Sequence, residues 1–120
     1  MIVLGSSSPR RKELLAMLGL EFIVYSPNID ENFNLKDPIA LSEKTALEKG
    51  KAVSLVYPNA TVIAADTVVL IEDEILGKPK NKEDAFKMIK EIQGKVHYVI
   101  TSVYLSKGLN YKVFSEKTKV

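Results

Sequence analysis

Apolar residues recur along this chain in two alternating kinds of pattern, which predict strands and helices in turn. Short runs rich in Val and Ile are typical of strands, whereas apolar positions three and four residues apart indicate amphipathic helices. Ser8-Pro9 and Asp37-Pro38 mark helix beginnings, because proline fits the first helical position. Gly19 and Gly94 mark helix ends. The expected strands are 2–4, 21–25, 61–71, 74–76, 96–105 and 111–114, and the expected helices are 9–18, 38–57 and 82–93.

The order of these elements, β-α-β-α-β-β-α-β-β, predicts the α/β class. Strands separated by helices favour right-handed crossovers, and the nearly continuous apolar run 61–71 is typical of a strand covered on both faces. We therefore expect a single α/β domain over residues 1–120, with a twisted, mixed, mostly parallel sheet flanked by helices. Residues 115–120 stop within a strand-like pattern, so we also expect the sheet to be incomplete at its C-terminus.

The composition is that of an ordinary globular protein. Hydrophobic residues make up 46% of the 120 positions and charged residues 27%, and the formal net charge is +2 with the lysines spread along the chain. This charge balance argues against a nucleic-acid partner, and no apolar run approaches the ~20 residues that span a membrane. The first apolar run is too short for a signal peptide, which favours a cytoplasmic protein.

The lack of cysteine narrows the possible chemistry. It excludes disulfides, thiol nucleophiles and zinc sites built on cysteine. His97 is the single histidine, so sites with several histidines are excluded as well. A metal would therefore be a hard cation, Mg²⁺ or Mn²⁺, held by carboxylate and phosphate oxygens.

The most informative local feature is the run Ser6-Ser7-Ser8-Pro9-Arg10-Arg11, which joins the first predicted strand to the first predicted helix. Hydroxyls, backbone N–H groups and guanidinium groups meet there at the positive end of a helix dipole. This combination is typical of a phosphate site. The alternative is an ordinary helix capped by Ser8 with solvated arginines, and the local pattern does not decide between the two.

Asp66 is the second informative residue, because it interrupts the apolar run 61–71. A carboxylate inside such a strand is costly to bury unless it is paired or binds a cation. It is a candidate general base, and the alternative is a structural carboxylate that accepts a hydrogen bond from Thr67 or from a neighbouring loop.

Three weaker candidates complete the set. Lys49 borders the apolar stripe of its helix, Lys78 lies in the loop Gly77-Lys78-Pro79, and Asp30-Glu31 is an acidic pair in a polar loop. Each taken alone is better explained as a solvated side chain. Together with the serine–arginine run and Asp66 they suggest cleavage of a phosphoanhydride, in which cations neutralise a polyphosphate and carboxylates hold Mg²⁺ or activate water. The phosphate-binding loop Gly-x-x-x-x-Gly-Lys is absent.

At this point the sequence resembles the Maf-like nucleotide pyrophosphatases, also called septum-formation proteins. The resemblance covers nearly the whole chain, and Gly50 and Ala64 depart from the alanine and glycine that are usual in the family. The matching segments are 6–15, Ile29-Asp30-Glu31, 46–53, Ile63-Ala64-Ala65-Asp66-Thr67-Val68, Leu76-Gly77-Lys78-Pro79 and 94–101.

The resemblance implies a Maf/ITPase-like fold and hydrolysis of nucleoside triphosphates to the monophosphate and pyrophosphate with a divalent cation. It implies that Asp66 accepts the proton of the attacking water and that Glu31 helps to hold the metal. It further implies phosphate binding by five residues. These are Ser6, Ser8, Arg11, Lys49 and Lys78.

Arg10 and Thr67 resemble the pattern of the members that act on dTTP and UTP, and the resemblance assigns them to substrate selection. The family is cytoplasmic, often homodimeric and linked to cell division. Its members are longer than this chain, which therefore resembles their N-terminal portion. A non-catalytic nucleotide-binding or cell-division regulatory fragment is the alternative function.

Overall fold

The computed structural model describes residues 1–30, 33–72, 74–76, 81–93 and 95–120. No helix among these residues is both long and apolar enough to cross a membrane. The strands are β1 (Ile2–Gly5), β2 (Ile23–Val24), β3 (Thr61–Ile71), β4 (Glu74–Leu76), β5 (His97–Lys107) and β6 (Asn110–Lys119). The helices are α1 (Pro9–Met17), α2 (Pro38–Val56) and α3 (Lys82–Ile92).

The strands form one mixed sheet in the order β2-β1-β3-β5-β6, with β4 paired to β3. The predicted α/β class with a mixed sheet flanked by helices is confirmed. The pairs β1–β2 and β1–β3 are parallel because helices connect them. The parallel part, which the pattern predicts to be the larger one, is confined to these three strands, since β4, β5 and β6 join by antiparallel pairing.

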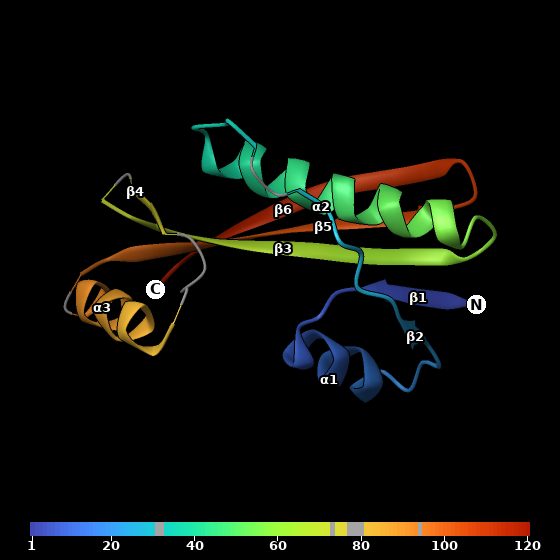
Figure 1. Cartoon of the computed structure of the whole chain (residues 1–120), viewed down its shortest axis with the longest axis horizontal. Coiled ribbons are helices and arrows are strands. Elements are labelled where there is room, and N and C mark those ends of the chain that lie inside the picture. Colours follow the sequence, from blue (N-terminus) through green and yellow to red (C-terminus); the bar gives the residue numbers. More distant parts are fainter. Residues whose placement is uncertain (31–32, 73, 77–80, 94) are drawn as a thin grey trace.

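Helices lie on both sides of the sheet (Figure 1). α2 runs along one face over β3 and β5, whereas α1 and α3 lie on the opposite side. The main core fills the space beneath α2 with small and β-branched side chains, which let the helix approach the strands closely. Its buried members are Val3, Ala46, Val53, Ala60, Val62, Ala64 and Tyr104.

Gly50 lets α2 pack closely against the ring of Tyr104 in β5. A Cβ atom at this position would lie 2.0 Å from Cδ1 of Tyr104, which is far inside van der Waals contact. The ring of Tyr104 also stacks on Tyr111 of β6, with 5.7 Å between the ring centroids. Glycine therefore makes room for a tyrosine ring that links α2, β5 and β6.

The ends of the elements follow the predicted signals in most places. The Ser8 hydroxyl accepts a hydrogen bond from the backbone N–H of Arg11 at 3.4 Å, as an N-cap does. Gly19 follows α1 with φ of +74°, the left-handed conformation that glycine favours. Gly94, the predicted end of α3, lies outside the described residues.

Two strands differ in length from the prediction. β2 has two residues instead of the predicted 21–25, because only Ile23 and Val24 pair with β1. β6 continues to Lys119, although its second half is polar and was predicted as the start of a separate strand. Its register with β5 is unbroken from Asn110 to Lys119, so backbone pairing at an edge of the sheet overrides the weak side-chain signal.

Candidate active site

One pocket of about 470 Å³ collects most of the predicted site residues. It lies beyond the carboxyl end of β1, where the chain leaves for α1 on one side of the sheet while α2 covers the other. Ligands bind at such a switch point in open α/β sheets, because the loops there diverge and leave a crevice. Its lining residues are Gly5, Ser6, Ser7, Ser8, Arg11, Ser26, Pro27, Asn28, Ile29, Lys49, Asp66 and Thr67.

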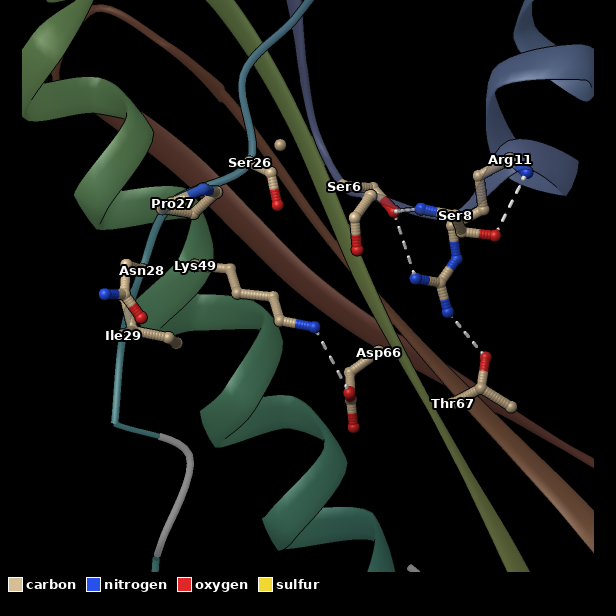
Figure 2. A pocket seen from close by; sticks show the side chains of 12 residues that line it. Ser6, Ser8, Arg11, Ser26, Pro27, Asn28, Ile29, Lys49, Asp66 and Thr67 are labelled. Carbon is tan, nitrogen blue, oxygen red and sulfur yellow. Dashed lines mark hydrogen bonds and ion pairs between the residues drawn. The ribbon is translucent and has the colours of Figure 1, made fainter. Parts of the chain in front are cut away.

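Residues 6–8, here called the serine loop, form one wall of the pocket (Figure 2). Ser6 is buried, and its Oγ accepts a hydrogen bond from the backbone N–H of Ser8 at 3.1 Å and one from Nη1 of Arg11 at 3.4 Å. The Ser6 and Ser8 oxygens act as acceptors in these bonds, and a hydroxyl can donate as well as accept. The loop is thus ordered by its own hydroxyl oxygens while it presents O–H groups at a helix N-terminus, where an anion is favoured.

Arg11 ties this wall to β3. Its Nη2 donates to Oγ1 of Thr67 at 2.8 Å, and its Nη1 donates to the carbonyl oxygen of Ala65 at 3.2 Å. Burial lowers the pKa of Arg11, and the negative charge of Asp66 opposes this effect. A guanidinium stays protonated under such conditions, so Arg11 is a fixed positive charge at the pocket wall.

Asp66 and Lys49 face each other across the pocket (Figure 2). Nζ of Lys49 lies 3.5 Å from Oδ1 of Asp66, and the two side chains are only 13% and 10% exposed. Asp66 is therefore not a surface carboxylate, and it is paired with a lysine of α2. Lys49 is not the solvated lysine that its helix position alone favours, since α2 turns it inward.

A second contact from α2 holds the backbone at Asp66. The hydroxyl of Ser42, a fully buried residue, donates to the carbonyl oxygen of Asp66 at 3.3 Å. Pattern analysis missed Ser42, and its only signal is a polar residue on the inner face of an amphipathic helix. Ser26, Pro27 and Asn28 were missed as well, although they follow β2, whose carboxyl end lies beside that of β1.

The remaining predicted site residues do not join this pocket in the described part of the structure. Arg10 is exposed and lines a neighbouring groove, together with apolar side chains such as Leu14 and Val103. Glu31 and Lys78 lie outside the described residues. Asp30, the partner of Glu31 in the sequence, is exposed.

The pocket offers oxygen ligands of the kind that Mg²⁺ and Mn²⁺ prefer. Within the described ranges no group of three or more His, Asp or Glu side chains could hold a metal ion. Asp66 is the described carboxylate on the pocket wall, beside the hydroxyls of Ser6 and Ser8. A cation at this pocket would take most of its ligands from the phosphate oxygens of a substrate, which leaves Asp66 for the role of a base.

Solved structures define the class of fold. The chain matches the Ham1 protein of Staphylococcus aureus with a TM-score of 0.68 at 18% identity, over 98% of this chain and 69% of that one. It matches the nucleoside-triphosphatase (dITP/XTP pyrophosphatase) of Mycobacterium abscessus with a TM-score of 0.60 at 15% identity, over 98% and 72% of the two chains. The architecture is therefore the α/β fold of the Ham1 proteins.

Sequence comparison places the chain more closely: it belongs to the Maf-like protein family, whose profile matches residues 1–120. The dTTP/UTP pyrophosphatase of Thermosipho africanus is 46% identical over 119 residues, which are 99% of this chain and 61% of that protein. The dTTP/UTP pyrophosphatase of Symbiobacterium thermophilum is 42% identical, over 99% of this chain and 62% of that protein. The chain thus spans about three-fifths of the length of these relatives, and the predicted family resemblance is confirmed.

Proposed function

We propose that this chain forms the phosphate-binding and water-activating part of a nucleoside triphosphate pyrophosphatase that acts on dTTP and UTP. The observation that carries the proposal is the buried pair Lys49–Asp66, placed in one pocket with the serine loop and Arg11. This pocket combines fixed positive charge, hydroxyl donors at a helix N-terminus and one buried carboxylate. Hydrolysis of a phosphoanhydride needs these parts.

Arg11, Lys49 and the serine loop bind the triphosphate. Arg11 is held by acceptors on β3 and the serine loop, so its charge is positioned before the substrate arrives. The Ser6 and Ser8 hydroxyls and the first turn of α1 add donors to phosphate oxygens. Lys49 then exchanges its carboxylate partner for a phosphate oxygen. By the family pattern, Lys78 adds a further cation.

Asp66 accepts the proton of the attacking water. Once Lys49 turns to phosphate, the carboxylate is available as a general base in a site that is largely shielded from solvent. Water adds to phosphorus, the phosphoanhydride bond between the α- and β-phosphates breaks, and the nucleoside monophosphate and pyrophosphate leave. A divalent cation held by Glu31 and phosphate oxygens would neutralise the charge that develops on the phosphates.

Substrate selection is assigned to Arg10 and Thr67. Support comes from the relatives named dTTP/UTP pyrophosphatase and from the position of Arg10 in a groove that shares Ser8, Arg11 and Thr67 with the pocket. A base placed in that groove would lie next to the bound phosphates. The proposal extends to modified pyrimidine nucleotides as substrates.

We further infer, from the family pattern alone, a cytoplasmic protein that forms a homodimer and acts in nucleotide metabolism linked to septum formation. Its partner is the nucleoside triphosphate rather than a nucleic acid or a membrane. Sedimentation equilibrium tests the dimer, since a single species of 13.3 kDa would contradict it.

A panel of nucleoside triphosphates tests the proposed function. The chain is incubated with each nucleotide and Mg²⁺ or Mn²⁺, and released pyrophosphate is measured. We expect dTTP and UTP to be hydrolysed faster than purine nucleotides. Binding of dTTP by calorimetry without hydrolysis would favour the alternative, a non-catalytic nucleotide-binding fragment, and loss of both would refute the proposal.

A further inference from the structure

Ser102 of β5 is a buried polar group beside the pocket that the proposed mechanism leaves unexplained. It is 0% exposed, and within the described part of the chain its hydroxyl has no hydrogen-bond partner. Burying a hydroxyl without a partner is unfavourable, so such a group calls for a specific reason. Ser106 lies on the same face of β5, four residues further along the strand. It shows the ordinary arrangement, because its hydroxyl lies 3.4 Å from that of Ser54.

The position of Ser102 supplies the reason. It is the residue of β5 that pairs directly with Asp66 of β3. Side chains of directly opposed residues project from the same face, and their Cβ atoms lie about 4.5–5.5 Å apart. The Asp66 carboxylate and the Ser102 hydroxyl can therefore meet by rotation of side-chain torsions, without any movement of the strands.

Lys49 from α2 and Arg11 from α1 are charged groups of the described chain that act on Asp66. Arg11 is engaged by Thr67 and by the carbonyl of Ala65, which keep it on the wall of the pocket. Lys49 is the cation in contact with the carboxylate, and it is also a predicted phosphate ligand. When a polyphosphate draws Lys49 away, the carboxylate loses that donor inside a site of low solvent access.

We propose that Ser102 is a positioning residue for Asp66, whose hydroxyl donates to the carboxylate when Lys49 leaves it. Ser42 holds the backbone carbonyl of Asp66, so the change is confined to the side chain. One carboxylate oxygen is then fixed by Ser102, which sets the direction from which the carboxylate meets water. This exchange of Lys49 for Ser102 as the partner of the Asp66 carboxylate needs only these side chains. Its use in turnover rests on the proposed function.

A titration of Asp66 without any ligand tests the exchange. Carbon-13 NMR of carboxyl-labelled aspartate follows the midpoint of the Asp66 titration in Lys49→Met, which lacks the ammonium group that contacts Oδ1 of Asp66. Adding Ser102→Ala to Lys49→Met should raise that midpoint by about 1 pH unit, a tenfold change in proton affinity, because a donor to the charged form is lost. Ser102→Ala alone should leave the midpoint unchanged, since Lys49 then occupies the carboxylate.

Two matched variants serve as controls for the Asp66 titration. Ser106→Ala in the Lys49→Met background removes a buried hydroxyl from the same face of β5 and should not move the midpoint. Ser102→Thr keeps the hydroxyl and should restore the value of Lys49→Met. An equal midpoint in Lys49→Met and Lys49→Met/Ser102→Ala would overturn the proposal, as would an equal shift for Ser102→Ala with Lys49 present.

Turnover tests the use of the exchange separately. The acid limb of kcat reports the substrate complex and that of kcat/KM reports the enzyme before binding. Ser102→Ala should shift the acid limb of kcat for dTTP upward and leave that of kcat/KM in place. A shift of both limbs, or of neither, would overturn a role in turnover. Absence of hydrolysis by the unaltered chain would refute the proposed function, while the ligand-free titration still decides the exchange.

Discussion

Gly50→Ala tests the packing that places α2, and with it Lys49, over the sheet. An added Cβ would lie 2.0 Å from Cδ1, 2.3 Å from Cε1 and 2.4 Å from Cγ of Tyr104. Cγ is the root of the ring, so turning the ring about its own axis does not relieve the clash. Relief to ordinary contact at 3.4 Å needs the closest atoms to separate by a further 1.4 Å, and Tyr104 is held by its stacking on Tyr111.

The magnitude follows from two opposing effects. Overpacking a filled core costs about 1–3 kcal/mol, and this contact, which involves three ring atoms, belongs at the upper end. Replacing glycine by alanine within a helix returns about 1 kcal/mol. We therefore expect a net loss of about 2 kcal/mol in the free energy of unfolding, which lowers Tm by roughly 5–10 °C for a domain of this size.

Thermal unfolding followed by circular dichroism measures the effect. Tyr104→Ala provides the matched background, because it removes the ring atoms that an alanine at position 50 would meet. There Gly50→Ala should raise Tm instead of lowering it, since only the helix propensity and the filling of space remain. A Tm of Gly50→Ala at or above that of the unaltered chain, or the same shift in both backgrounds, would refute the reasoning.

Two further predictions concern the pocket. Arg11→Lys keeps the charge but loses the two guanidinium contacts to Ala65 and Thr67. Calorimetry should therefore show dTTP binding weakened by about 10–100-fold. Unchanged affinity would contradict a role of these guanidinium contacts in binding. Chelation of divalent cations should abolish pyrophosphate release from dTTP, and added Mg²⁺ or Mn²⁺ should restore it; turnover that persists in excess chelator would exclude the cation.

Sequence patterns predicted the elements where local chemistry determines them. Ser8-Pro9 predicts the start of α1, and Gly19 predicts its end, because a cap and a left-handed turn depend only on neighbouring residues. The apolar run of β3 likewise predicts a covered strand. The strand-like pattern of residues 115–120 was predicted, but not that they continue the strand begun at Asn110, since that continuity is set by backbone pairing with β5 across a hairpin.

The candidate site was predicted in its residue types more than in its contacts. Asp66 stands out because a carboxylate interrupts an apolar strand. The inward direction of Lys49 depends on how α2 is rotated over the sheet. The packing of Gly50 against Tyr104, a residue far along the chain, helps to set that rotation. The link from Arg11 to Thr67 joins positions 56 residues apart, so no local pattern contains it.

The central claim is that Asp66 activates water in the phosphate pocket, and Asp66→Asn tests it most directly. The variant keeps the shape of the side chain but cannot take up a proton. Pyrophosphate release from dTTP is measured together with dTTP binding. The account predicts a loss of kcat of about 10²–10⁴-fold, with binding kept within a few-fold. Equal turnover by Asp66→Asn and the unaltered chain would contradict it.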